Sequence, residues 1–373
     1  MSTYPPRECG IATFTQDLAA AFKKEFSPRY KSKIITMNNG MPKNPKYPKE
    51  VIFNINETSI KDYIKIAQKI NKTKAVKIVN VQHEFGIFGG RYLNYLSGFL
   101  ETIKKPVVIS LHSVVPNPPE SMKSIIQYLA KKSDCLVVMA DKAVEILKKD
   151  YGIRSKITVI HHGVHEVSYE PSIAAKTKLR YKDKLVLSSF GLISGGKSYE
   201  DIIKAMPSVI KKFPNALYLI IGKTHPGILR DEGEKYRNRL KKLIKKLKLN
   251  NNVKFVNKYL PVPELLEYLK ASDIFVTSGK GLHQIVSGTL SYAMGCGRPV
   301  IAHPFLHAKE TVTKDRGILV KLGDSKSYAK AIINILSNPK LRESMGKNTY
   351  KYTRHMVWSN VAKAYMKVFK RYI

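Results

Sequence analysis

The chain has 373 residues, which at about 150 residues per domain predicts two or three domains. Hydrophobic residues make up 43% and charged residues 25%, a balance that excludes a disordered or fibrous protein. Lysine and arginine total 65 against 28 aspartate and glutamate residues, and the resulting net charge of +37 excludes an acidic, solvating protein.

The cysteines and the apolar runs indicate where the protein resides. Cys9, Cys135 and Cys296 are widely separated and lack the spacing of a metal site, so we expect a reducing compartment. No apolar run reaches the ~18 residues that span a bilayer. The first residues, MSTYPPRECG, lack the apolar segment of a signal peptide. We therefore expect a cytoplasmic protein, either soluble or peripheral at the inner membrane face.

The first half alternates short apolar runs with helical stretches. We expect strands in KSKIITMN, AVKIVNVQHE, KPVVISLHSV, CLVVMA and KITVIHHGV, with helices such as SIKDYIKIAQKI and ESMKSIIQYLAKK between them. The first strand is cut to STY, which leaves two interpretations open: a true start upstream, or a weakened edge of the sheet. The stretch from 165 to 184 is polar and unpatterned, and we interpret residues 166–182 as a linker.

The second half repeats the alternation more clearly. Strands are expected in KLVLSSFG (184–191), ALYLIIG, VKFVNKYL, DIFVTSG and RPVIAHP. Helices are expected in SYEDIIKAMPSVIKKF (198–213), YRNRLKKLIKKLKL (236–249), PELLEYLKAS, SGTLSYAMGCG and SKSYAKAIINILSN (325–338). Strands that are apolar throughout are typical of a parallel sheet covered on both faces. The sequence therefore predicts two doubly wound α/β domains facing across a cleft, with ligands at the carboxyl ends of the strands.

Two loops in the second half have the features of an anion site. In GLISGGKS (191–198), Gly195 and Gly196 expose backbone N–H groups just before Lys197 and a helix start, which favours an anion. The spacing fits neither the Walker loop nor the fingerprint G-x-G-x-x-G. In HQIVSGTLSYAMGCG (283–297), Gly288 and Thr289 stand at a second helix start. Two such starts in one domain suit a nucleoside diphosphate.

Polar residues also follow the predicted strands of the first half. Gly10 lies in RECGIAT, His83 and Glu84 begin the glycine-rich loop HEFGIFGG, and His112 ends a strand in LHSVV. A histidine at a strand end can position a hydroxyl group or carry a proton. For each of these residues a purely structural role, as a tight turn, an internal hydrogen bond or a core histidine, stays open.

Taken in order, these motifs resemble the family-4 retaining glycosyltransferases of the GT-B fold over nearly the whole chain. The segments that carry the resemblance are STYPPRECGIATFT, HEFGIFGG, LHSVV, GLISGGKS, IGKTHPGILRDEGEKYR, SGTLSYAMGCGRPVIAHPFLHAKE and VWSNVAKAYMKVF. The resemblance implies metal-independent transfer of a hexosyl group, with retention, from a UDP- or GDP-linked sugar to a carbohydrate or lipid-linked hydroxyl acceptor. It implies no cofactor.

The resemblance also assigns parts to the domains. Residues 1–165 form the acceptor-side domain, residues 183–356 hold the nucleotide sugar, and residues 357–373 form a helix that crosses back to the N-terminal domain. The implied site residues are His112 as the catalytic histidine near the transferred sugar, Lys197 on the donor diphosphate, Gly288 and Thr289 as its backbone cap, Gly10 facing the phosphates and acceptor, and His83 and Glu84 on the sugar or acceptor side.

The chain departs from the family pattern in two places. Leu192 stands where the family usually has an arginine. The family's pair of glutamates falls on Gln284 and Tyr292, which we keep as donor-binding residues, and a related subgroup has glutamate where this chain has His283. A carboxylate expected near the sugar is therefore absent, and we place His283 on the sugar side. An alternative stays open: a catalytically weak or silent GT-B protein that binds a nucleotide sugar or a partner.

The basic excess has two interpretations. It is either a solvated basic face that follows from a lysine-rich composition, or a surface for an anionic membrane, to which helix YRNRLKKLIKKLKL and the tail 351–373 would contribute. We do not expect a nucleic-acid partner, because no recognised nucleic-acid motif accompanies the charge. The sequence names neither the sugar, the base, the acceptor nor the oligomeric state.

Overall fold

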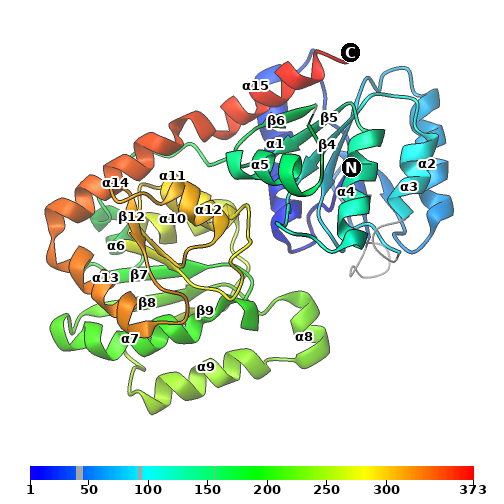
Figure 1. Cartoon of the computed structure of the whole chain (residues 1–373). Helices are drawn as coiled ribbons and strands as arrows, with labels where there is room; N and C mark the ends of the chain where they lie inside the picture. The colour runs from blue at the N-terminus through cyan, green and yellow to red at the C-terminus, as the bar shows by residue number, and fades with distance from the viewer. Residues whose placement is uncertain (39–44, 91–94, 155) are drawn as a thin grey trace. The chain divides into compact units, whose positions relative to one another are not determined.

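The computed structural model describes residues 1–38, 45–90, 95–154 and 156–373 (Figure 1). The chain divides into two compact units. Unit 1 comprises Met1–Gly163, His283–Val286 and Met356–Ile373. Unit 2 comprises Val164–Leu282 and Ser287–His355. Each unit has a core of parallel strands with helices packed on it, and each is described separately below.

In the part of unit 1 that the structure describes, six strands form two parallel sheets. Its strands are β1 (Ile34–Met37), β2 (Val51–Ile55), β3 (Val79–His83), β4 (Val107–Leu111), β5 (Cys135–Val138) and β6 (Ile157–Val159). One sheet pairs β1 with β2, and the other has the order β3-β4-β5-β6. Its helices are α1 (Gly10–Phe26), α2 (Ile60–Lys72), α3 (Tyr95–Thr102), α4 (Glu120–Lys132), α5 (Asp141–Asp150) and α15 (Trp358–Phe369).

The first two residues join these sheets. Ser2 forms a parallel bridge with Thr36 of β1, donating its N–H to the Ile35 carbonyl at 2.9 Å. On the other side, the Met1 carbonyl accepts the N–H of Gln82 in β3 at 3.0 Å. The shortened first strand therefore lies between β1 and β3, and it is not an edge of the sheet.

Helices α1 and α15 pack together in the core of unit 1. Phe14 of α1 meets the Trp358 ring of α15 edge-on, with ring centroids 5.1 Å apart. A Cβ atom on Gly163 would lie 2.3 Å from the indole of Trp358, so only glycine fits there. Although α15 follows all of unit 2 in the sequence, its residues belong to unit 1.

Unit 2 has one six-stranded parallel sheet. Its strands are β7 (Leu185–Phe190), β8 (Ala216–Ile221), β9 (Val253–Val256), β10 (Ile274–Thr277), β11 (Val300–Ala302) and β12 (Gly317–Leu319), in the order β12-β11-β10-β7-β8-β9. Its helices are α6 (Ile173–Lys178), α7 (Tyr199–Lys212), α8 (Pro226–Glu232), α9 (Lys235–Lys246), α10 (Val262–Ala271), α11 (Gly288–Gly295), α12 (Leu306–Thr311), α13 (Ser325–Ser337) and α14 (Pro339–Thr353).

The burial of the strands explains why the sheets are parallel. All six residues of β8 and all five of β4 are buried, so both faces of these strands are covered by other elements. Helix α7 turns Ile202, Ile203 and Met206 into the same apolar cluster that buries Tyr218 of β8. The predicted fold class, two Rossmann-like α/β units, is confirmed. Among the described residues, no helix combines the length and the apolarity needed to cross a membrane.

The segment predicted to be a linker, residues 166–182, packs on unit 2. It contains α6, and Lys176 of this helix forms an ion pair of 2.5 Å with Asp273, both side chains being buried. The same carboxylate oxygen of Asp273 accepts the Val186 N–H at 2.7 Å, which ties the pair to β7. Residues 166–182 are ordered by contacts with residues that are distant in the sequence. Such contacts produce no local periodicity of apolar residues, so the sequence of this segment is unpatterned.

His83 is also placed differently from its predicted role on the sugar or acceptor side. Its side chain is 0% exposed, and its ring stacks on Phe88 at 6.0 Å with Phe85 edge-on. Neither ring nitrogen has a hydrogen-bond partner among the described residues. Burial lowers the pKa of His83 to about 3, so the ring is neutral in the folded chain. His83 is therefore a core residue of unit 1.

We expect His83→Leu to stabilise the protein, and increasingly so in acid. The pKa of His83 is about 3 in the folded chain and 6.5 in the unfolded chain. At any pH between these two values, the histidine is protonated in the unfolded chain and neutral in the folded chain. The wild type therefore loses stability as the pH falls below 6.5, and the advantage of the variant should grow by about 2 kcal/mol from pH 7 to pH 5. Urea unfolding at both pH values measures this, with the exposed His355→Leu as control. A variant less stable than wild type at both pH values would contradict this placement.

Candidate functional site

Two loops that follow strands of the unit 2 sheet lie side by side at its carboxyl edge. Strands β7 and β10 are neighbours, so the loop after β7, residues 191–198, lies next to the loop after β10. Gly191 adopts a φ of +136°, and a Cβ atom there would lie 3.5 Å from the Thr289 methyl group. The first residues of α11 are therefore adjacent to the glycine-rich loop, as expected for loops at the ends of parallel strands.

Ser278 fixes the shape of the glycine-rich loop. Residues Gly195–Lys197 form one 3₁₀ turn, and Ser198 follows in the left-handed region with φ 46°. The buried Ser278 hydroxyl lies 2.8 Å from the Lys197 carbonyl and 2.7 Å from the Ser198 carbonyl. The Lys280 N–H donates to the Gly196 carbonyl at 3.0 Å. These hydrogen bonds to backbone carbonyls stabilise a loop conformation that would not persist without them.

Lys197 is a half-buried cation without a counter-charge. Its side chain has no ion pair or hydrogen bond within the part of the chain that the structure describes. It lies near His303, whose pKa is lowered by burial and, to a smaller degree, by the charge of Lys197. Burial lowers the pKa of Lys197 itself. Removing an ammonium group from water without a partner costs free energy, and a bound anion would offset that cost.

The start of α11 supplies backbone donors beside this loop. Ser287 caps the helix by accepting the Leu290 N–H at 3.3 Å, and its own N–H donates to Nδ1 of the buried His307 at 3.0 Å. The first helical N–H groups, at Gly288 and Thr289, have no acceptor within the helix. Together with the helix dipole they make this edge of unit 2 favourable for an anion.

Tyr292, predicted to bind the donor, lies in the core of unit 2. Its side chain is 6% exposed and stacks on Phe190 at 6.3 Å, with His165 edge-on at 4.9 Å. Phe190 immediately precedes Gly191 at the end of β7. Tyr292 therefore packs against Phe190, the residue that precedes the glycine-rich loop. It does not lie at the surface beside Gly288 and Thr289.

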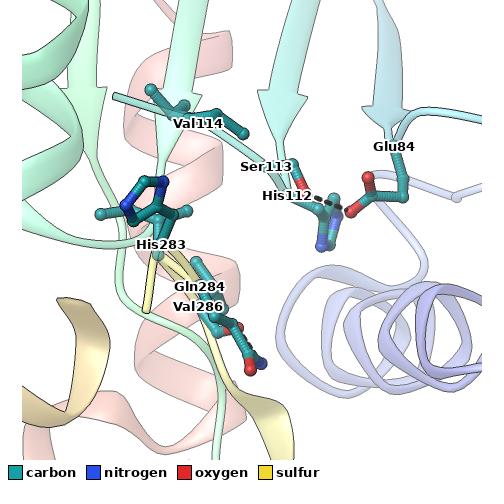
Figure 2. Close-up of a pocket in the computed structure, with 9 residues that line it drawn as sticks. Glu84, His112, Ser113, Val114, His283, Gln284 and Val286 are labelled. Carbon is teal, nitrogen blue, oxygen red and sulfur yellow. Dashed lines mark hydrogen bonds between the residues drawn. The ribbon is translucent and has the colours of Figure 1, made fainter. Parts of the chain in front are cut away.

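Unit 1 contains a cavity of about 290 Å³, near the lower end of the range for small-ligand pockets. Figure 2 shows Glu84 and His112 at the ends of neighbouring strands, with His283 and Gln284 on a separate segment. Its lining residues are Glu84, His112, Ser113, Val114, Val115, His283, Gln284, Ile285 and Val286. Four residues that the sequence analysis placed in the site are thus gathered in one cavity.

Glu84 follows β3 and His112 follows β4, and the two side chains form different hydrogen bonds. The carboxylate of Glu84 accepts the Ser113 hydroxyl and the Phe85 N–H, each at 2.8 Å, while burial raises the pKa of Glu84. His112 is 8% exposed, and its Nε2 lies 2.8 Å from the Gln82 amide oxygen. Burial, with the charges of His162 and His83, lowers the pKa of His112 to about 3. The cavity therefore offers a neutral imidazole beside a carboxyl group.

The segment His283–Val286 was predicted to belong to the second domain, within 183–356. The structure assigns these four residues to unit 1, although both flanking residues belong to unit 2. Gln284 folds back so that its amide N–H donates to the Val286 carbonyl at 2.8 Å, and Ile285 is buried. His283 and Gln284 are exposed, so they line the cavity with polar atoms that a ligand can reach.

Gly10 begins helix α1 and is exposed. The Cys9 side chain caps this helix by accepting the Ala12 N–H at 3.4 Å, and a Cβ atom on Gly10 would meet nothing within 4 Å. Phe14, one turn further on, contacts the His112 ring edge-on at 4.8 Å. Gly10 is not among the residues that line the cavity, but its helix supports the cavity histidine.

Sequence reasoning missed three polar residues that shape these sites. Ser113 forms a hydrogen bond with Glu84, and Gln82 forms one with His112. Ser278 forms hydrogen bonds with the backbone of the glycine-rich loop. Gln82 and Ser113 stand directly beside residues that were singled out, so their polarity at strand ends was an available signal. The partner of Ser278 lies 81 positions away in the sequence, and no local pattern indicates it.

Two family models match the chain. The model described as "Glycosyl transferases group 1" matches residues 171–352, and "Glycosyltransferase Family 4" matches residues 10–166. Together these matches cover nearly all of both units.

Related sequences are glycosyltransferases. An uncharacterised glycosyltransferase of Methanocaldococcus jannaschii is 30% identical over 67% of this chain and 62% of its own length. A GDP-mannose-dependent monoacylated α-(1-6)-phosphatidylinositol monomannoside mannosyltransferase of Corynebacterium glutamicum is 28% identical over 63% of this chain and 60% of its own. The chain thus spans about 60% of the length of these curated relatives.

Solved structures share the fold. The Anabaena protein HepE, crystallised with UDP and glucose, superposes with a TM-score of 0.75 at 15% identity, covering 99% of this chain and 98% of its own. Sucrose-phosphate synthase of Thermosynechococcus elongatus gives a TM-score of 0.72 at 17% identity, covering 96% and 92%. The two parallel-stranded units, the family matches over both and these neighbours agree, and the chain is a GT-B protein that belongs to the family-4 glycosyltransferases.

Proposed function

We propose that the protein moves a sugar from a nucleoside-diphosphate sugar to a hydroxyl acceptor, with retention of configuration and without a metal ion. The observation that carries the proposal is Lys197, a half-buried cation without a partner among the described residues. Relatives in this family include an enzyme named for its dependence on GDP-mannose, and a structural neighbour binds UDP and glucose. Unit 2 is the proposed nucleotide-sugar half.

The donor side of this proposal follows from charge. A leaving nucleoside diphosphate gains negative charge in the transition state, and pre-arranged donors stabilise that charge without reorganisation. Lys197 and the N–H groups of Gly288 and Thr289 are held in place before any ligand binds, by Ser278 and Ser287 respectively. The missing family arginine at Leu192 leaves Lys197 as the principal side-chain cation of this loop in the proposal.

The unit 1 cavity is the proposed place for hydroxyl groups of the sugar and acceptor. A neutral His112 and the carboxyl group of Glu84 both bond hydroxyls well, and His112 with a pKa of about 3 does not serve as a proton donor at neutral pH. Although the family carboxylate is replaced by His283, Glu84 places a carboxyl group in the same cavity. This observation favours an active enzyme over a silent binding protein.

The acceptor is proposed by class only. The mannosyltransferase of Corynebacterium glutamicum is named for a lipid-linked acceptor, and another relative, from Kribbella flavida, is named a D-inositol 3-phosphate glycosyltransferase. Both acceptors are polyhydroxylated and anionic. We therefore propose a polyol or glycan acceptor, free or lipid-linked, and a basic protein of net charge +37 would attract an anionic one.

The proposal predicts a defined product. Thermal-shift screening against UDP-, GDP- and ADP-linked sugars should show stabilisation by one nucleotide class, and transfer from that donor should keep its anomeric configuration, as read from the proton coupling of the product by NMR. Transfer should persist in excess EDTA. A product of inverted configuration would overturn the retaining assignment, and an absence of binding to all three classes would contradict the function.

Lys197→Ala should weaken binding of that nucleotide sugar by about 1.5–3 kcal/mol, the range of a charge-assisted hydrogen bond, or roughly 10- to 150-fold in affinity. Titration calorimetry measures the change. Lys204→Ala removes an equal charge from an exposed position on α7 and should leave the affinity nearly unchanged. Equal affinity for Lys197→Ala and the wild type would remove Lys197 from the donor site.

His283→Glu tests the silent-protein alternative. A second carboxyl group in the cavity that already holds Glu84 should repel it, so we expect transfer by an active wild type to fall. The silent-protein alternative predicts the reverse, an inactive wild type in which the restored carboxylate creates activity. His355→Glu, at an exposed position of unit 2, is the control for the added charge.

A further inference from the structure

We propose that Tyr236, on helix α9, is a positioning residue that works with Arg239 to hold the carboxylate of Glu200 away from Lys197. The inference rests on the proposed function, because it reserves the charge of Lys197 for the diphosphate of the donor. Tyr236 is 7% exposed, and all four residues belong to unit 2.

Glu200 is an internal competitor for the proposed anion site. It is the second residue of α7, and no acidic residue lies nearer to Lys197 in the sequence. A carboxylate in the first turn of a helix is attracted to the positive helix end, and an ammonium group close by adds to that attraction. Yet Lys197 has no ion pair among the described residues, and the cause of its lowered pKa is burial. The carboxylate of Glu200 is therefore directed to other partners.

Both oxygens of the Glu200 carboxylate are bonded to side chains of α9. Its Oε2 accepts the phenol O–H of Tyr236 at 2.5 Å, and its Oε1 accepts an N–H of Arg239 at 3.2 Å. The guanidinium of Arg239 also lies over the Tyr236 ring, 4.9 Å from its centroid. Residues three positions apart on a helix share a face, so α9 presents the two donors side by side. Hydrogen bonds to both oxygens fix the direction in which the carboxylate points.

Tyr236 is in turn fixed against the glycine-rich loop. Its phenol oxygen accepts the Tyr199 N–H at 3.1 Å, one of the groups at a helix start that have no acceptor within the helix. A Cβ atom on Gly195 would lie 3.9 Å from the Tyr236 ring, an ordinary contact distance. Burial and, to a smaller degree, the bond to Glu200 raise the pKa of Tyr236, so the phenol keeps its proton at neutral pH. Tyr236 is therefore a permanent donor to Glu200, placed beside the backbone that carries Lys197.

Loss of the phenol would turn Glu200 into an inhibitor of the anion site. Arg239 alone holds the carboxylate weakly, because its side chain is 63% exposed and an exposed ion pair contributes little stability. The freed carboxylate would pair with Lys197, and a diphosphate would have to displace it. An opposite charge within about 4–6 Å shifts a pKa by roughly one unit or more, and one unit is a tenfold change in equilibrium. The pKa of Lys197 and the affinity for a nucleotide should therefore change together.

The first test measures the pKa of Lys197 in the free protein and needs no substrate. In protein with ¹³C-labelled lysine, the carbon next to the amino group reports the pKa, and Lys197→Arg identifies the signal. We expect Tyr236→Phe to raise this pKa by about one unit, and Tyr236→Phe combined with Glu200→Gln to return it to the wild-type value. Tyr350→Phe, which removes a phenol bond to the Val167 carbonyl, should match the wild type. An unchanged pKa in Tyr236→Phe, or a raised pKa that persists without the Glu200 charge, would overturn the proposal.

Arg239→Gln repeats this test at an exposed position, where folding does not depend on the side chain. It should raise the pKa of Lys197 by a smaller amount than Tyr236→Phe, because the phenol bond to Glu200 remains. Lys235→Gln removes an equal charge from another exposed position of α9 and is the control for the lost charge. A rise in Arg239→Gln no larger than in Lys235→Gln would contradict the holding of Glu200 by α9.

The last test is the affinity for UDP, GDP and ADP, measured by titration calorimetry. Tyr236→Phe should bind the nucleotide that the wild type prefers about tenfold more weakly, and adding Glu200→Gln should restore the affinity. If Tyr236 served only to accept the Tyr199 N–H, Glu200→Gln would restore nothing, and this result would refute the positioning role. If the wild type binds none of the three nucleotides, the proposed function fails, whereas the pKa of Lys197 still decides whether Tyr236 holds Glu200 away from it.

Discussion

The charge of Lys197 is the constraint on which the account of the donor side depends. A half-buried ammonium group without a partner among the described residues lowers the stability of the folded chain, and its lowered pKa has the same cause. The chain maintains this arrangement with the hydrogen bonds from Ser278 to two backbone carbonyls, the left-handed Ser198 and the packing of Gly191 beside α11. A loop held in a fixed conformation around an unpaired charge is expected if the substrate supplies the opposite charge. The diphosphate of a nucleotide sugar supplies it.

Unit 1 shows a different arrangement, in which a neutral imidazole and a carboxyl group are already hydrogen-bonded to protein groups. His112 is bonded through Nε2, and Glu84 is held by Ser113 and a backbone N–H. Donors and acceptors that are fixed in this way select among ligand hydroxyls by geometry, whereas a cation selects by charge. The division of labour that we propose, phosphate recognition in unit 2 and hydroxyl recognition in unit 1, follows from this difference in the two sets of side chains.

Much of the fold could be predicted from the sequence, because apolar strands such as β8 and amphipathic helices such as α7 carry strong local patterns. The same holds for the loop of Lys197, whose glycines mark a turn at a strand end. Local patterns do not record distant partners, and the remaining differences have that origin. Residues 166–182 are ordered by the buried ion pair of Lys176 with Asp273, and His83 is packed against Phe88 on a loop whose path the sequence leaves open.

The central claim is that an anionic group of the substrate pairs with the charge of Lys197. The most direct measurement is the pKa of Lys197 by NMR, from the carbon next to its amino group, in the free protein and with saturating UDP or GDP. The account predicts a pKa below the ordinary 10.5 in the free protein and a clear rise when the nucleotide binds, because a diphosphate stabilises the charged form. A pKa that stays the same under a bound, saturating nucleotide would contradict it.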